Sequence, residues 1–167
     1  MKSNTFDELE KIDSTKPLFC FYKKIYKIFD KLNIEPIVYG GLAYFYYTKD
    51  ETIPIKDIDL LVPKSDFIRI QEMLDSLKNI TYKVMPWHSI EIFENGMKID
   101  IDSIEHFLDP RPREFNKATF DNFCFNFLNR DSLVSVYEEA LLNMPKELKL
   151  IEKRKKYQKK LENLKKL

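Results

Sequence analysis

The hydrophobic positions in the first half of the chain switch between helical and strand-like spacing. Across Thr15–Asn33 they recur every three or four residues, which predicts an amphipathic helix, and Pro17 suits its first turn. Ile37–Tyr39 is a short apolar run typical of a strand, and Leu42–Thr48 is an apolar, aromatic segment that predicts a buried helix. A further amphipathic helix is expected after Ser65, which could cap it. The pattern favours one domain in which helices and strands surround a single core.

The strand predicted at Asp57–Val62 carries two acidic residues, Asp57 and Asp59, separated by one position. Side chains on a strand alternate between its faces, so both carboxylates project one way while Ile58 and Leu60 project the other. Two neighbouring carboxylates repel each other, and a buried core would reject them without a cation. A divalent metal is the simplest such cation. A solvated turn at the end of a strand would give the same pattern.

A second group of acidic residues lies in a predicted hairpin, Ile90–Asp102. Asn95-Gly96 is a strong signal for a two-residue turn between two alternating runs. The second run places Asp100 and Asp102 on one face, with isoleucines on the other. Glu91 belongs to the first run, and its alternation predicts that it does not share the carboxylate face.

Gly40 and Gly41 stand between the predicted strand Ile37–Tyr39 and the helix that follows it. Glycines at such a turn let a ligand approach the backbone closely, and the start of a helix offers free N–H groups to a phosphate. A strand, a Gly-Gly turn, a helix, an Asp-x-Asp strand and a hairpin ending in Asp form a specific constellation, although each part is weak alone.

The remaining third of the chain contains a loop, a strand and two helices by the same criteria. His106–Ala118 is polar and punctuated by prolines, which indicates a loop, and Phe120–Leu128 alternates well enough to predict one strand. A helix is expected to begin with Asp131 or Ser132 as its cap, and Pro145 is expected to open the last helix.

Composition indicates a folded globular protein, because 44% of the 167 residues are hydrophobic and 14% are aromatic. No apolar run is long enough to span a bilayer, and the first residues lack an apolar signal region, so we expect a cytoplasmic protein without a membrane partner. Cys20 and Cys124 lack a C-x-x-C spacing, which favours buried free thiols over a zinc site.

The net charge of +1 conceals an asymmetry between the two ends of the chain. Residues 145–167 carry a local charge of +7, which leaves −6 on the first 144 residues. We favour a solvated terminal helix, since lysine-rich helix faces are ordinary, but contact with nucleic acid stays open. In the first interpretation the helix would dock through Leu148, Ile151, Leu161 and Leu164. In the second, the contacts would include Lys155, Lys156 and Lys159.

Three motifs together, Gly40-Gly41, Asp57-Ile58-Asp59 and Ile99-Asp100-Ile101, make the chain resemble the DNA polymerase β-like nucleotidyltransferase superfamily. The nearest likeness is to small bacterial members, such as lincosamide nucleotidyltransferases and the nucleotidyltransferase toxins of abortive-infection systems. The motifs cover about residues 32 to 102. The resemblance implies an α+β (α/β) fold: a polymerase-β-like palm with a mixed β-sheet flanked by helices, and with C-terminal helices. It suggests a nucleotidyltransferase domain over 1–130 and a helical appendage over 131–167, packed on the same domain.

The implied reaction moves a nucleoside monophosphate from an NTP, for example ATP, to a hydroxyl-bearing acceptor, with release of pyrophosphate. The resemblance implies that two Mg²⁺ ions are held by Asp57, Asp59 and Asp100, and that Asp100 could take the proton of the acceptor. Asp102 shares the face of Asp100 and is an alternative third carboxylate.

The resemblance also implies that the backbone of Gly40 and Gly41 binds the phosphates of the NTP. Many relatives place an Arg, and a Ser or Thr, just before the Asp-x-Asp pair, whereas here the stretch Ile53–Lys56 offers Lys56 alone.

The sequence leaves the acceptor open: a small molecule, a protein and an RNA end all present an oxygen nucleophile. One alternative function is a catalytically weak or inactive module of the same fold, acting as a partner in a toxin–antitoxin or RNA-binding system. Another is a transferase that modifies RNA or tRNA, for which the basic C-terminal helix would be the acceptor platform.

Overall fold

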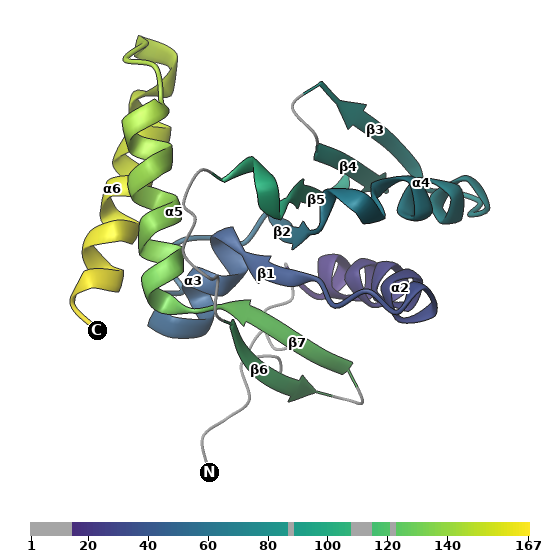
Figure 1. The fold of residues 1–167 in the computed structure, drawn as a ribbon. Coiled ribbons are helices and arrows are strands. Elements are labelled where there is room, and N and C mark those ends of the chain that lie inside the picture. The colour runs from purple at the N-terminus through teal and green to yellow at the C-terminus, as the bar shows by residue number, and fades with distance from the viewer. Residues whose placement is uncertain (1–14, 87–88, 108–114, 121–122) are drawn as a thin grey trace.

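A mixed seven-stranded β-sheet lies at the centre of the computed structural model, which describes residues 15–86, 89–107, 115–120 and 123–167 (Figure 1). The strand order is β3-β4-β5-β2-β1-β7-β6. In chain order the strands are β1 (Ile37–Tyr39), β2 (Asp57–Val62), β3 (Thr81–Met85), β4 (Ser89–Glu94), β5 (Met97–Ser103), β6 (Phe115–Phe120) and β7 (Phe123–Leu128). The pairs β2–β5 and β1–β7 are parallel, and the other neighbours are antiparallel.

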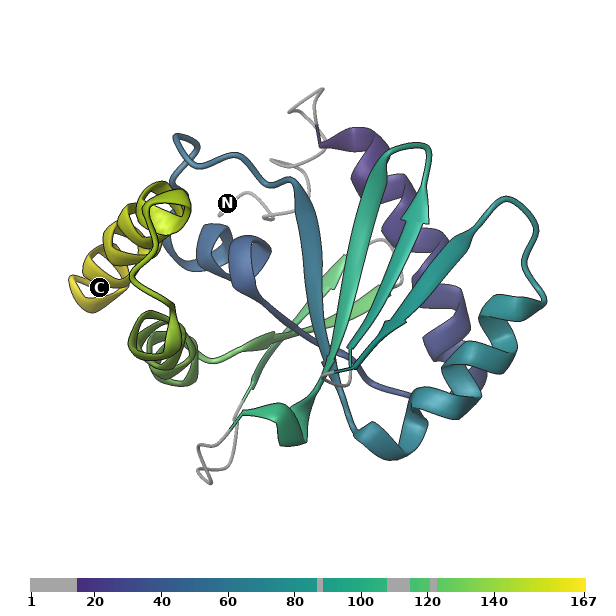
Figure 2. The same ribbon diagram turned by 90° about the horizontal axis from the view of Figure 1, so that it is seen from above.

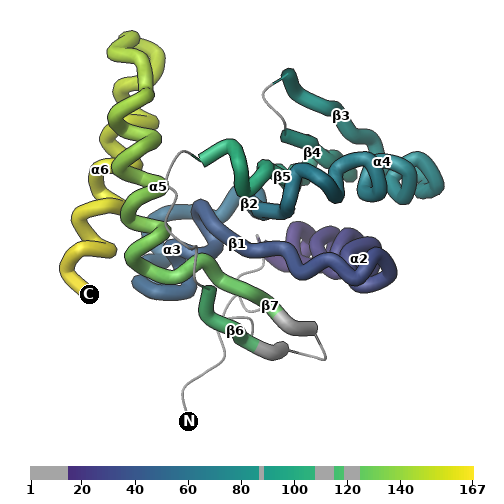
Figure 3. The backbone as a smooth tube through the Cα atoms, in the orientation of Figure 1, coloured from purple at the N-terminus to yellow at the C-terminus, as the bar shows by residue number. Residues whose placement is uncertain are grey.

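The helices gather at two ends of the sheet. They are α2 (Lys16–Leu32), α3 (Gly40–Thr48), α4 (Phe67–Asp75), α5 (Arg130–Asn143) and α6 (Ile151–Lys165). α2 packs on β2 and β5 with α4 beside it, whereas α3, α5 and α6 lie together at the other end (Figures 1 and 2). β7 leads directly into α5, and α6 returns alongside α5 to the C-terminus (Figure 3).

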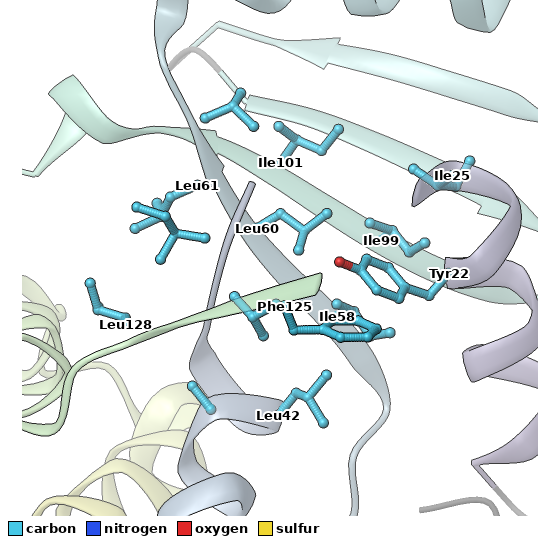
Figure 4. Close-up of a cluster of buried hydrophobic side chains, with 14 of the residues drawn as sticks. Tyr22, Ile25, Leu42, Ile58, Leu60, Leu61, Ile99, Ile101, Phe125 and Leu128 are labelled. Atoms are coloured by element: carbon cyan, nitrogen blue, oxygen red, sulfur yellow. The ribbon is translucent and has the colours of Figure 1, made fainter. Parts of the chain in front are cut away.

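The main core lies between the sheet and α2. Ile58 and Leu60 of β2 and Ile99 and Ile101 of β5 are buried on one face of the sheet, and Tyr22 of α2 lies beside Ile58 and Ile99 (Figure 4). These four residues alternate with the aspartates along β2 and β5. Because the apolar side chains fill the core on one face, the aspartates project from the opposite face.

The predicted elements of the first hundred residues are largely confirmed. α2 ends where Asn33 adopts a left-handed conformation, with φ at 56°, as the C-cap. The strands β1 and β2 have the predicted limits, and the hairpin β4–β5 turns at Asn95-Gly96. α3 begins at Gly40 itself, two residues earlier than predicted, and α4 begins at Phe67 without a side-chain cap from Ser65.

The prediction of a single strand over Phe120–Leu128 is wrong, as is that of a loop throughout His106–Ala118. Two antiparallel strands, β6 and β7, occupy this region, and β6 begins at Phe115. β6 lies at the edge of the sheet with an exposed start, and edge strands tolerate polar residues that hide their strand character.

The starts of the last two helices also differ from the prediction. Asn129 caps α5, since its side chain accepts a hydrogen bond from the N–H of Ser132 at 2.8 Å. α6 begins at Ile151 after a 3₁₀ turn, not at Pro145.

Two predictions about burial are wrong in part. The last helix packs on the core through Leu161 and Leu164, as predicted, whereas Leu148 is 87% exposed and Ile151 is 41% exposed. Cys20 is exposed because it points away from the buried stripe of α2.

Among the described residues, no helix is long and apolar enough to cross a membrane.

Candidate active site

Three carboxylates meet on the face of the sheet opposite α2. Asp57 and Asp59 of β2 and Asp100 of β5 each place an oxygen within 4.8 Å of the others. The parallel pairing of β2 with β5 sets Asp59 directly beside Asp100, and residues in register on neighbouring strands share a face. The grouping therefore follows from strand alternation together with this register.

Asp102 lies one pleat further along β5 and is not one of the three. It is in register with Leu61, and its carboxylate accepts a hydrogen bond from the hydroxyl of Tyr39. Of the two candidates for a third carboxylate, the structure brings Asp100, and not Asp102, to the pair on β2.

Glu91 shares the carboxylate face, so the prediction that it does not is wrong. The β4–β5 pairing places Glu91 directly opposite Asp100. Alternation shows which residues of one strand share a face, but it does not show whether that face is the same as the face of given residues on the next strand. Counting outward from the two-residue turn at Asn95-Gly96 would have found the pairing.

The three carboxylates form a concentrated negative charge that is only partly compensated. Burial, followed by the charges of Asp57 and Asp100, raises the pKa of Asp59 to about 7. Burial also raises the pKa of Asp100, although the ammonium of Lys98 opposes this shift. Lys98 Nζ lies 2.7 Å from Asp100 Oδ2 and 3.6 Å from Asp57 Oδ2. Asp100 Oδ1 is buried without a hydrogen-bond partner among the described residues.

The glycine pair packs the start of α3 against Asp59. Gly40 has a φ of +63°, and a Cβ at this position would collide with the carboxylate of Asp59. The N–H of Gly41 donates to Asp59 Oδ2 at 3.4 Å. This site therefore requires glycine at position 40 for both its backbone conformation and its close approach to a carboxylate.

The carboxylates open into a cavity of about 770 Å³. One side, which we call the carboxylate floor, is formed by Asp57, Asp59, Asp100 and Asp102 on the sheet. The other side, the helical wall, comes from α5 and α6. Its residues at the cavity include Tyr137, Tyr157, Lys153, Lys156 and Lys160. Gly40, Gly41 and the exposed Lys56 also line the cavity, so all the candidate residues predicted from the sequence meet in one place.

Lys160 is the member of the helical wall that the sequence analysis missed most clearly. It is 4% exposed, and its ammonium donates to the hydroxyl of Tyr137 at 3.1 Å. Burial, with the charge of Lys156, lowers its pKa to about 8, while Asp59 acts in the opposite direction. Only a weak sequence pattern indicated that Lys160 is buried: it precedes the buried Leu164 by one helical turn, in a helix where lysines are frequent.

The three lysines predicted to contact nucleic acid do not share one face. Lys156 lines the cavity, but Lys155 pairs with Glu152 at 3.1 Å, and Lys159 donates to the hydroxyl of Thr52 at 3.1 Å. The structure therefore divides the basic segment into residues that face the cavity and residues that do not.

No protein-family model matches the chain, and no curated protein matches it. Solved structures do match. One is a lincosamide antibiotic adenylyltransferase with lincomycin bound, at a TM-score of 0.55 and 15% identity over 87% of this chain and 94% of that one. Another is the antibiotic-resistance factor ANT(2″)-Ia, at 0.58 and 16% identity over 91% and 90%. A third is an antigenic nucleotidyltransferase-like protein from Paracoccidioides brasiliensis, at 0.56 and 11% identity over 95% and 75%.

At these identities the likeness concerns the fold. The chain has a polymerase β-like nucleotidyltransferase fold of the α+β class, built on a mixed sheet. This confirms the fold that the three sequence motifs predicted.

Proposed function

We propose that the chain is a nucleotidyltransferase that moves a nucleoside monophosphate from an NTP to a hydroxyl-bearing acceptor. The observation that carries the proposal is the group of three carboxylates, Asp57, Asp59 and Asp100, at the base of a cavity in this fold. In the reaction, the acceptor oxygen bonds to the α-phosphorus, the bond to the β-phosphate oxygen breaks, and pyrophosphate leaves.

The carboxylate floor fits a divalent metal. Asp100 Oδ1 is buried with no partner among the described residues. Burial, and then the charges of Asp57 and Asp100, raises the pKa of Asp59, and a bound cation would oppose both effects. Three carboxylates without His or Cys suit a hard cation such as Mg²⁺. Asp57 and Asp59 would hold two ions, and Asp100 would complete the coordination of one. When bound, such ions polarise phosphoryl oxygens and stabilise charge on the attacking and leaving oxygens.

The chain's own residues supply the remaining roles. Asp100, whose pKa is raised, is the proposed acceptor of the proton from the attacking hydroxyl. Lys98 holds Asp100 in place through its ion pair. On the side of β2 away from β5, the start of α3 at Gly40 and Gly41 supports the phosphates with the positive end of a helix. Lys56, at the edge of the cavity, would add a positive charge there.

The acceptor is proposed only as a class. The lincosamide adenylyltransferase binds lincomycin, so small polyhydroxylated molecules are the first acceptors to test, followed by protein and RNA hydroxyls. A cavity of about 770 Å³ has room for both a nucleotide and part of an acceptor.

The test is calorimetric titration of each NTP into the protein, with Mg²⁺ and with EDTA. We expect Mg²⁺-dependent binding that is lost when Asp57→Asn and Asp59→Asn are combined. Asp131→Asn is the matched control, because this exposed aspartate lies on α5 with Arg130 as its ion-pair partner. Transfer of radiolabel from the α-phosphate to candidate acceptors would then identify the reaction. Full NTP binding and turnover by the double variant would contradict the proposal.

A second candidate is the partner-binding module, and one observation favours it. Leu142 is 84% exposed and Leu148 is 87% exposed near the connection between α5 and α6. Contiguous patches of exposed apolar residues mark surfaces that bind another protein, and these two leucines would be the centre of such a patch. If no NTP bound to the folded protein at any Mg²⁺ concentration, this second function would replace the first.

A further inference from the structure

Lys160 is buried with most of its hydrogen-bonding capacity unused. An ammonium has three N–H donors, and among the described residues the hydroxyl of Tyr137 is the acceptor for one of them. Burying a charged group without full hydrogen bonding costs free energy. The side chain nevertheless lines the cavity and is 4% exposed, so the fold retains an incompletely satisfied cation at the site.

Three tyrosine rings hold the ammonium of Lys160 at the cavity. The Nζ atom lies 5.4 Å from the ring centre of Tyr44, 5.3 Å from that of Tyr137 and 6.0 Å from that of Tyr157. These contacts come from α3, α5 and α6, and cation–π attraction favours such positions. The charge is therefore placed by three helices, unlike that of a lysine free to move in solvent.

The position of Lys160 relates it to the start of α3. Its Nζ lies 3.7 Å from the point where a Cβ on Gly41 would stand. No ion pair within 4.0 Å joins it to Asp57 or Asp59, so among the described residues it is not the direct counterion of the carboxylate floor. Lys98 is the counterion of Asp100, and Lys56 is exposed.

We propose that Lys160 binds the phosphates of the nucleotide, which makes α6 a part of the nucleotide site. The proposal rests on the function proposed above. A phosphate oxygen beside the N-terminus of α3 would complete the hydrogen bonding of the ammonium and face the positive end of that helix. Lys160 then supplies the charge that the sequence before Asp57 offers only through the exposed Lys56.

The test compares nucleotides that differ only in their phosphates. A titration with ATP, GTP, CTP and UTP first selects the nucleotide, and the matching nucleoside, monophosphate, diphosphate and triphosphate are then titrated with Mg²⁺. For the wild type we expect affinity to rise with each phosphate. In Lys160→Met the triphosphate should bind about 10- to 100-fold more weakly, with the nucleoside unchanged, because only a charged hydrogen bond to phosphate is lost.

Lys159→Met is the matched control, since it removes one positive charge from the neighbouring position of α6, outside the cavity lining. Its affinity for the triphosphate should stay within about two-fold of wild type, because exposed charges contribute little. Lys160→Met should unfold at the same or a higher temperature, since methionine fills a similar volume without a charge to bury. Lys160→Gln, which keeps a donor for Tyr137, serves if the methionine variant does not fold.

The outcomes separate the two proposals. If the wild type binds no triphosphate with Mg²⁺, the proposed function itself is overturned. If the wild type binds and transfers, while folded Lys160→Met or Lys160→Gln binds the triphosphate within two-fold of wild type, only the role of Lys160 is overturned. A loss that is equal for nucleoside and triphosphate would also overturn it, because that loss would reflect a general disturbance of the cavity.

Discussion

The two sides of the cavity are built in different ways. The carboxylate floor lies on β2 and β5, whose hydrogen-bonded register sets the spacing of the side chains before any ligand arrives. The helical wall depends on the packing of α5 and α6 on each other and on α3. Lys160 lines the same cavity as the floor although it stands 101 positions beyond Asp59 in the chain. Precise geometry therefore comes from the sheet, and the opposite charge comes from the helices.

This difference matters for the ligand. The floor gathers negative charge with an unmatched oxygen on Asp100, while the wall presents a buried ammonium with unused donors. A ligand that satisfies both sides has to bring cations to the floor and anionic groups to the wall. A metal-bound nucleoside triphosphate has this charge pattern. The two sides can be tested separately, because variants in one leave the other in place.

The largest effect is expected where the floor meets α3. Gly40→Ala should lower turnover about 100-fold, because the new Cβ collides with the carboxylate of Asp59 and displaces a proposed metal ligand. The positive φ alone should cost about 1 kcal/mol of stability. In Gly41→Ala the nearest atom to the Cβ is Lys160 Nζ, at an ordinary 3.7 Å, so the loss should be about ten-fold at most. Turnover assays and denaturant unfolding of the two variants measure the losses of activity and of stability. Equal effects at the two glycines would contradict the close contact of Gly40 with Asp59.

The wall should be weakened by removing its anchor. Leu164 is fully buried, so Leu164→Ala should cost about 2–5 kcal/mol of unfolding free energy and loosen α6. We expect weaker triphosphate binding with metal binding to the floor unchanged, measured by denaturant unfolding and by calorimetry. Leu142→Ala, at a position 84% exposed, is the control and should stay within about 0.5 kcal/mol of wild type. Loss of metal binding in folded Leu164→Ala would show that the two sides are not independent.

The smallest effect should be the dependence of stability on pH without metal. The pKa of Asp59 is about 7 in the folded protein, above its ordinary value of 3.8, so the folded state binds the proton more tightly. Protonation of Asp59 therefore adds a few kcal/mol at most to the free energy of unfolding. This contribution is complete below about pH 4 and is lost as pH rises through 7. In EDTA, the wild type should therefore lose stability from pH 5 to 8 relative to Asp59→Asn. Mg²⁺ should reverse this trend, since it binds the ionised carboxylates. Parallel pH curves for the two proteins in EDTA would rule out the shift.

Strand alternation made much of the floor predictable. Asp57 and Asp59 had to share a face once Ile58 and Leu60 were assigned to the core, and Asn95-Gly96 marked the turn before Asp100. Alternation alone did not place Glu91, because the face of one strand relative to the next depends on register. It also did not separate Asp100 from Asp102, which differ only in which of them lies beside Asp59.

The sequence by itself determined the amphipathic helix at the start, the Gly-Gly turn, the two acidic strands and, through their resemblance to known motifs, the fold. These are local patterns, in which the period of a helix or strand decides where each side chain points. The tertiary structure alone decided that α6 faces the carboxylate floor across the cavity and that Lys160, among ten basic residues of the last segment, is buried at the cavity. The physical reason is that burial of a lysine depends on neighbours from distant segments, here the tyrosines of α3 and α5, which no local spacing reveals.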